Sequence, residues 1–152
     1  MAIAVLALIA ALVAVYLHLW KIGATGPLTC SGGGGCEVAQ MSAYGWFPGP
    51  DVPILGRPGW LGVDVALIGA IGYGAITVLA VLGTLPALAG RRWISTALLS
   101  LIVLGVLFTW RLKYGEWIVL RVFCVWCLES FVTIHLCLVL AWLDRRRFRH
   151  AA

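Results

Sequence analysis

The stretch that decides the fold is residues 122–143, which read VFCVWCLESFVTIHLCLVLAWL. A helix needs roughly 20 predominantly apolar residues to cross a bilayer, and this run is long enough. Its polar exceptions are Glu129 and His135, and it opens with Cys124 and Cys127, spaced as a C-x-x-C motif. One segment therefore predicts both a membrane span and a candidate reactive centre at the start of that span.

Three further apolar runs precede this segment, at about residues 2–20, 61–85 and 93–110. Hydrophobic residues make up 62% of the 152-residue chain and charged residues only 11%, whereas a soluble domain carries about 25% charged residues. This composition excludes a soluble globular protein, a disordered chain and a nucleic-acid-binding domain. We expect an all-α integral membrane protein, a single domain over residues 1–152 in which four transmembrane helices form a bundle and residues 21–60 form an outer loop. The first run is expected to be an uncleaved anchor, because it lacks the positively charged start of a signal peptide.

The basic residues indicate how the four spans are oriented. More than half of the 11 Lys and Arg residues are packed into two short segments, and the others are spread over residues 21–60 and 111–121. The packed ones are Arg91, Arg92, Arg145, Arg146, Arg147 and Arg149. Dense basic clusters mark the cytoplasmic side of a membrane and anchor the chain against its lipids. We therefore expect both termini in the cytoplasm and residues 21–60 and 111–121 on the outer face.

Four of the five cysteines form two close pairs, which this topology places on the outer, oxidising side. If the last helix begins near Arg121, the sulfurs of Cys124 and Cys127 lie one turn apart, where the positive end of the helix dipole favours thiolate. Cys30 and Cys36 flank a serine and four glycines, whose backbone freedom lets the two sulfurs bond or separate.

Two such pairs suit a relay of electrons by thiol–disulfide exchange, ending on a lipid-soluble acceptor such as a quinone. Alternatives remain open for these residues. The pairs could be structural disulfides or buried small hydrophobes, or they could pass a soft metal ion such as Cu(I) along the protein. Against the metal carrier, the chain has only two methionines. The fifth cysteine, Cys137, lies deeper in the last span and is expected to serve packing.

At these residues the sequence resembles the vitamin K epoxide reductase family. The matching elements are the loop pair Cys30-x5-Cys36, a serine six residues later at Ser42, and the FCVWC motif over residues 123–127. The order of the four spans also matches, so the resemblance covers nearly the whole chain. The DsbB-type quinone reductases share four spans and two cysteine pairs, but their C-x-x-C lies in the first outer loop.

The resemblance implies a bundle around a quinone, menaquinone or ubiquinone, with the outer loop and a short helix capping the site. Cys36 would form the mixed disulfide with a separate thioredoxin-like or DsbA-like protein, and Cys30 would pass the electrons to Cys124. Cys127 would then sit beside the quinone and complete its reduction. Ser42 would order the loop or the site, and the ring of Phe131 would either pack on the quinone or belong to the core.

The short spacing of the loop pair is typical of bacterial members, so we expect the protein in the bacterial inner membrane, with both cysteine pairs on the outer face. The chain ends without a fused thioredoxin-like domain, which favours disulfide formation in exported proteins over turnover of vitamin K epoxide. No metal site is expected. Glu129 is a candidate for proton handling during quinone reduction, although it could equally snorkel to the interface.

Other polar residues carry weaker expectations. Residues 37–42 are expected to form a short helix at the membrane surface, and Asp64 is expected to cap the second span. Arg111, Lys113 and Arg121 could favour a thiolate at the motif, but anchoring at the membrane edge is the more ordinary role for each.

Overall fold

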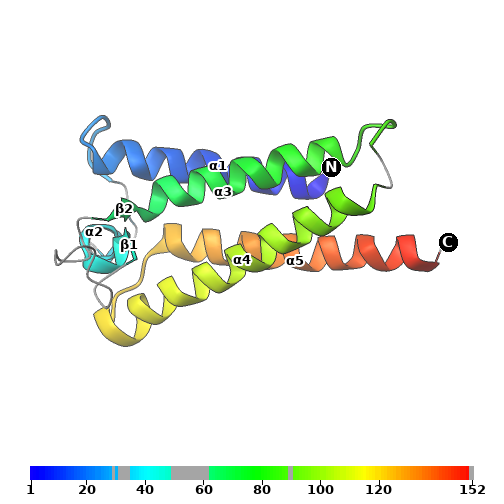
Figure 1. Ribbon diagram of the computed structural model, residues 1–152. Helices are drawn as coiled ribbons and strands as arrows, with labels where there is room; N and C mark the ends of the chain where they lie inside the picture. The colour runs from blue at the N-terminus through cyan, green and yellow to red at the C-terminus, as the bar shows by residue number, and fades with distance from the viewer. Residues whose placement is uncertain (29, 31–34, 49–61, 89–90, 151–152) are drawn as a thin grey trace.

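The computed structural model describes residues 1–28, 30, 35–48, 62–88 and 91–150 (Figure 1). Four long helices run along one another, and a small cap of short elements covers one end of them. The elements are α1 (Ala2–Lys21), α2 (Gly35–Met41), a 3₁₀ turn η1 (Ala43–Gly45), β1 (Trp46–Phe47), β2 (Val63–Asp64), α3 (Val65–Leu82), α4 (Arg92–Tyr114), a π-helical turn η3 (Gly115–Leu120) and α5 (Val125–His150).

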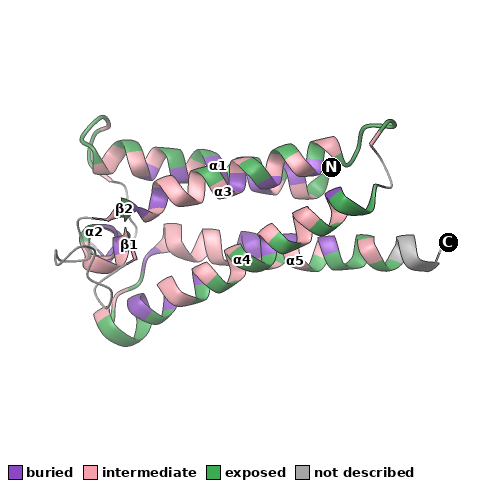
Figure 2. Ribbon diagram, viewed as in Figure 1, coloured by how far each residue is buried: buried purple, intermediate pink, exposed green. Residues whose placement is uncertain are grey.

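Four helical segments are long and apolar enough to cross a membrane, which confirms the expected all-α membrane bundle. They are Ala2–Lys21, Val65–Leu82, Arg92–Leu120 and Val125–Arg146. Many large apolar side chains are exposed on the outward faces of these helices (Figure 2). Lipid can cover such faces, because a bilayer removes the need to hide them in a protein core.

The helix boundaries differ from the expected ones in three places. The second span begins at Val65 rather than near residue 61, because Asp64 pairs in a short sheet and its carboxylate accepts the amide of Ala66 at 3.0 Å. This contact confirms the expected cap. The third span continues through η3 to Leu120 instead of ending near residue 110, because the charges beyond that point pair with each other (below). The last helix begins at Val125 rather than near Arg121.

Small residues set how closely the helices approach. The buried face of α1 is a stripe of alanines that packs against α3, where Gly69 lies opposite Ala14. In α4, Gly105 admits the side chain of Ile134 from α5, since a Cβ at Gly105 would lie 3.0 Å from its Cδ1 atom. Tyr73 of α3 donates from its hydroxyl to the carbonyl of Ser130 on α5 at 2.8 Å. These contacts join all four helices around one core.

The cap is tied to the bundle by a buried carboxylate at Asp64. Lys21, at the end of α1, approaches one Asp64 oxygen at 2.5 Å and donates to the carbonyl of Gly45 at 3.0 Å. His18 lies 2.6 Å from the other Asp64 oxygen. Since Trp46 and Asp64 are paired in the short sheet, one cluster holds α1, the start of α3 and the cap together.

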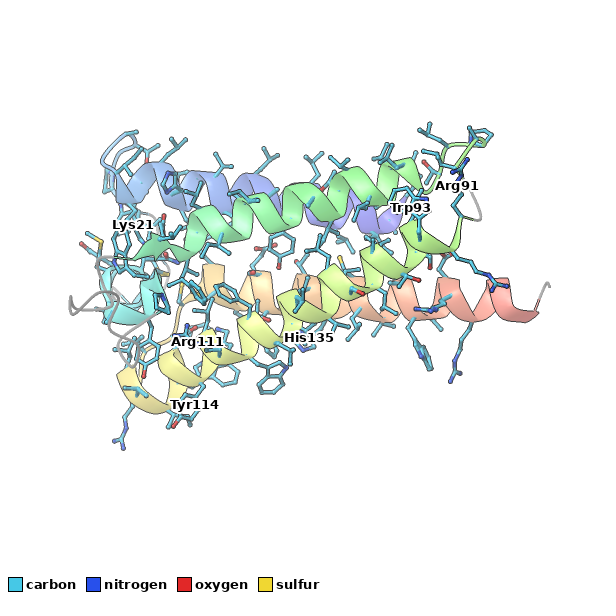
Figure 3. All side chains as sticks on the ribbon, in the orientation of Figure 1. Lys21, Arg91, Trp93, Arg111, Tyr114 and His135 are labelled. Atoms are coloured by element: carbon cyan, nitrogen blue, oxygen red, sulfur yellow. A yellow bond between two sulfur atoms is a disulfide. The ribbon has the colours of Figure 1, made fainter. Side chains whose placement is uncertain are left out.

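The cap and the chain termini lie at opposite ends of the bundle (Figure 1). Lys21 lies at the cap end, whereas Arg91 lies at the end that carries both termini (Figure 3). The relative arrangement of these groups is therefore the one that the basic residues predicted.

Candidate functional site

The C-x-x-C motif lies where an extended segment enters α5. Cys124 directly precedes the helix, and its sulfur accepts the backbone N–H of Cys127 at 3.3 Å, while its carbonyl accepts the N–H of Leu128 at 3.0 Å. This is the position of an N-cap side chain, which satisfies one of the unpaired amides at a helix start. The later start of α5 therefore brings the sulfur of Cys124 directly onto a helical amide.

The environment of Cys124 lowers the pKa of its thiol. The largest cause is a hydrogen bond with the side chain of Cys127, and the backbone amide of Cys127 adds to it. Burial opposes the shift, as does the negative charge of Glu116, whereas Lys113 supports it. A lowered pKa increases the fraction of thiolate, which is the nucleophile in disulfide exchange.

Removing the side-chain donor at Cys127 is expected to raise the pKa of Cys124. In chains that also carry Cys30→Ser, Cys36→Ser and Cys137→Ala, Cys124 is the one remaining thiol of both Cys127→Ser and Cys127→Ala. The serine hydroxyl can still donate to the thiolate, so its variant should titrate at a lower pH than the alanine variant. Thiolate absorbance in the ultraviolet measures this, and coinciding curves would show that the Cys127 side chain has no such effect.

The loop pair is joined in a disulfide, Cys30–Cys36. Cys36 lies in the first turn of α2 and is completely buried, whereas Cys30 is partly exposed. Residues 31–34, which hold most of the glycine run, lie outside the described residues. The helix expected after Cys36 is confirmed as α2. The expectation that Cys36 meets a partner protein stays a prediction, and the greater exposure of Cys30 favours Cys30 as an alternative.

The loop pair and the motif meet at a glycine. The Cα atom of Gly35 packs so closely on the extended segment before α5 that a Cβ there would lie 2.4 Å from the carbonyl oxygen of Phe123. Only a residue without a side chain fits this contact. Since Gly35 directly precedes Cys36 and Phe123 directly precedes Cys124, the contact brings the backbones of the two pairs side by side.

A buried ion pair holds Cys124 from the other side. Glu116, in the π-helical turn, accepts the backbone N–H of Cys124 at 2.7 Å through one carboxylate oxygen. Its other oxygen lies 2.7 Å from the ammonium of Lys113, and both side chains are almost fully buried. The backbone carbonyl of Glu116 also accepts the N–H of Val122 at 3.1 Å. The chain turns back at Arg121, whose φ of 54° lies in the left-handed region.

The sequence did not single out Glu116, and it assigned Lys113 to the membrane edge. The structure shows instead that the two form one neutral unit inside the protein, which lets the third span continue past residue 110. The signal in the sequence was their spacing, because residues three apart on a helix face each other. Arg111 likewise belongs to the cap, since its guanidinium donates to the carbonyl of Pro48 and lies over the ring of Phe47.

A cavity of about 380 Å³ lies inside the bundle beside the motif. Its lining is mostly apolar and comes from all four long helices and from α2, and it includes Cys127, Gln40 and Glu129. Gly72 of α3 also lines it, and no atom lies within 4 Å of the place where a Cβ at Gly72 would be. Pockets of roughly 300–1,000 Å³ with apolar walls and a few polar groups are typical of small-molecule sites. The cavity thus fits an apolar ring system that carries a few oxygens.

The other expected site residues are distributed differently. Glu129 lines the cavity, where one of its oxygens accepts the hydroxyl of Thr133 at 3.0 Å. Ser42 is not part of the lining, and its hydroxyl donates to the carbonyl of Ala39 at 2.8 Å, so it orders the end of α2. Phe131 is also outside the lining and packs 4.2 Å from the ring of His135, centroid to centroid.

Cys137 behaves as expected from the sequence, and His135 also serves packing. Cys137 is completely buried in the hydrophobic core. His135 accepts the indole N–H of Trp110 on Nε2 at 3.1 Å, and its Nδ1 lies 2.7 Å from the carbonyl of Phe131. Because an indole can only donate, Nδ1 must carry the proton that reaches this carbonyl. His135 is therefore a neutral, fully hydrogen-bonded packing residue.

Comparison with known proteins gives a match to the family model described as the Vitamin K epoxide reductase family, over residues 1–142. Members of that family are in general quinone-linked thiol oxidoreductases that work with thiol partner proteins. The match covers both cysteine pairs, the first three spans and most of the fourth. The chain is therefore a multi-pass membrane protein that belongs to the vitamin K epoxide reductase family.

Proposed function

We propose that this protein takes electrons from a thioredoxin-like or DsbA-like dithiol through Cys30 and Cys36, and passes them through Cys124 and Cys127 to a membrane quinone. The observation that carries this proposal is the contact of Gly35 with Phe123, in which the residue before Cys36 packs on the residue before Cys124. In this way the protein would regenerate the oxidant that introduces disulfides into exported proteins.

The proposed order begins at Cys30. A thiolate of the partner attacks the sulfur of this partly exposed residue, the Cys30–Cys36 bond breaks, and a second partner thiol releases Cys30 as the partner becomes a disulfide. The freed thiolate of buried Cys36 then attacks Cys124 in an oxidised Cys124–Cys127 pair, and Cys127 leaves as a thiolate. Attack of Cys30 on Cys36 restores the loop disulfide and leaves the motif as a dithiol, so two electrons have moved.

The cavity is the proposed site of the quinone, and Cys127 is the cysteine in its lining. A bound quinone accepts two electrons and two protons and leaves as a hydroquinone, while the motif dithiol that supplies them becomes a disulfide. We propose that the chain contributes apolar walls for the ring and a thiol at Cys127 beside it.

The test uses the purified full chain, a reduced DsbA-like protein and a soluble quinone, with quinone absorbance as the readout. We expect hydroquinone formation that requires Cys30, Cys36, Cys124 and Cys127 and persists in Cys137→Ala. Failure to form hydroquinone would refute the proposal. Stoichiometric binding of Cu(I) by the pairs, with no hydroquinone formed, would favour a metal carrier instead.

The proposed orientation puts the cysteine pairs on the outer face of a bacterial inner membrane and both termini in the cytoplasm. It is supported by the placement of Arg91 and the termini at the end opposite the cap (Figures 1 and 3). An impermeant maleimide applied to intact cells after reduction should label Cys30. If labelling requires permeable cells, the orientation is the opposite of the proposed one.

Gly35→Ala is expected to slow exchange between the pairs. The added Cβ would meet backbone atoms of Phe123, which cannot move aside as a flexible side chain can. Misplacing reacting groups by about 1 Å can cost roughly a hundredfold in rate. The readout is the single-turnover rate at which a reduced loop pair reduces the motif. Gly26→Ala is the matched control, because no atom lies within 4 Å of its Cβ position, and equal rates in the two variants would contradict the proposed contact.

We further propose that Glu129 holds a proton during quinone reduction. Its second carboxylate oxygen is buried and has no hydrogen-bond partner within the described part of the chain, although the residue lines the cavity. Glu129→Gln keeps the shape and the bond from Thr133 but cannot exchange a proton. It should lower hydroquinone formation by about a hundredfold, the scale of general acid–base catalysis, and leave loop–motif exchange unchanged. Turnover equal to that of the wild type would show that Glu129 has a structural role and holds no proton in the reaction.

A further inference from the structure

Gln40 occupies an unusual position in the cavity beside Cys127. It lies in α2, its exposed fraction is 7%, and its amide nitrogen donates to the sulfur of Cys127 at 3.7 Å. Its amide oxygen is also buried, yet no described residue forms a hydrogen bond with it. The residue lines the same cavity as Cys127.

An unpartnered buried amide oxygen is rare, because burial without a hydrogen bond is unfavourable. Apolar side chains dominate the cavity wall, so a leucine at this position would match its surroundings. The neighbouring polar side chains do not supply the missing partner, since the hydroxyl of Tyr73 already bonds to Ser130 and one oxygen of Glu129 to Thr133. The missing partner of Gln40 must therefore come from something that enters the cavity.

We propose that Gln40 forms a hydrogen bond with an oxygen of the quinone and so fixes that oxygen next to the sulfur of Cys127. The inference rests on the proposed function, because it takes the ligand of the cavity to be a quinone. A side-chain amide suits both oxidation states. Its N–H groups can donate to the carbonyl oxygen of a quinone, and its oxygen can accept the hydroxyl of a hydroquinone.

The position of Gln40 also ties the ligand to the loop pair. Cys36 and Gln40 are four residues apart in the same short helix, so both lie on its buried face. One helix therefore carries the inner sulfur of the loop disulfide and the amide that touches Cys127. Any shift of α2 as Cys36 exchanges its partner would move the amide with it.

The test measures binding rather than turnover. The full chain in nanodiscs is titrated with menadione, a methylnaphthoquinone, in its oxidised form and, without air, in its reduced form, whose hydroxyls can donate to the free oxygen of Gln40. Methylnaphthalene, which has the same ring system without oxygens, is titrated in parallel. Gln40→Leu should bind menadione, the reduced form above all, about three- to tenfold more weakly, the equivalent of one net hydrogen bond, and bind methylnaphthalene as the wild type does. Glu37→Gln, on the exposed face of the same helix, is the control and should bind both probes normally.

The outcomes separate the two proposals. If Gln40→Leu weakens both probes alike, or neither, then Gln40 only shapes the cavity and the inference is wrong, while the proposed quinone reduction stands. If the wild type binds no menadione and forms no hydroquinone, the proposed function itself fails. Gln40→Met, a second apolar variant of similar length, should reproduce the selective loss, and both variants should unfold at the wild-type temperature or above it, since each removes an unpaired buried oxygen.

Discussion

Cys127→Ser is expected to abolish hydroquinone formation, with a loss of at least about a hundredfold, the smallest effect typical of removing a group that acts in the chemistry. The substitution removes the only cysteine among the described residues that line the cavity. It also leaves Cys124 without a second sulfur with which to form the motif disulfide, so the two electrons have no exit. The quinone assay described above measures this directly.

The same variant should also accumulate a disulfide between Cys36 and Cys124. Cys124 can still attack the loop pair and release Cys30, but Cys127 is no longer there to resolve the product. Peptide mapping under non-reducing conditions identifies the partner. A bond from Cys124 to Cys30 would show that the order proposed for the loop pair is reversed. Undiminished hydroquinone formation would show that Cys127 does not reduce the quinone. Cys137→Ser, in the core, should retain activity.

Glu116→Leu is expected to be the most destabilising single change near the motif. It leaves the ammonium of Lys113 buried without its counter-charge and the amide of Cys124 without its acceptor. Breaking a buried pair by removing one partner costs about 3–5 kcal/mol. The free energy of unfolding in detergent measures the effect. We expect activity to fall with it, because Cys124 loses the contact that fixes its backbone.

A double variant separates the charge from the hydrogen bond. Lys113→Met with Glu116→Gln removes both charges, while the glutamine oxygen can still accept the N–H of Cys124. Replacing a buried pair by neutral groups of similar volume is often close to neutral for stability. The double variant should therefore recover most of the loss. If the double variant is as unstable as Glu116→Leu, then the attraction between Lys113 and Glu116 itself stabilises the protein, in addition to the cost of an unpaired buried charge.

The sequence predicted what depends on local composition. The apolar runs gave the four spans, Asp64 was identified as a cap, and the cysteine spacing identified the two pairs and the family. Those inferences work because length, hydropathy and capping act within one segment of the chain. The end of the third span was predicted too early, because a lysine such as Lys113 is expected to face water. Only its contact with Glu116 explains why it is buried.

The rest of the site depends on contacts between distant segments. Gln40 is an ordinary polar residue in sequence, and its role emerges only when α2 lies over Cys127. His18 meets Asp64 from 46 residues away, a contact that neither segment indicates by itself. Phe131 was a candidate for the quinone because of the family resemblance, and the rotation of α5 turns it toward Trp110 and His135. Helix rotation and loop docking are set by packing, which no single segment encodes.

The close approach of Gly35 to Phe123 has a consequence for bioenergetics. Since both sulfur pairs sit at one end of the bundle, the proposed reaction draws its electrons and protons from one side and delivers them together to the lipid phase. No net charge would then cross the bilayer. The membrane potential would therefore do no work on the reaction, whereas moving one elementary charge across it would involve about 2.3 kcal/mol per 100 mV. Turnover should thus be indifferent to voltage, and it would proceed equally well in depolarised and energised cells.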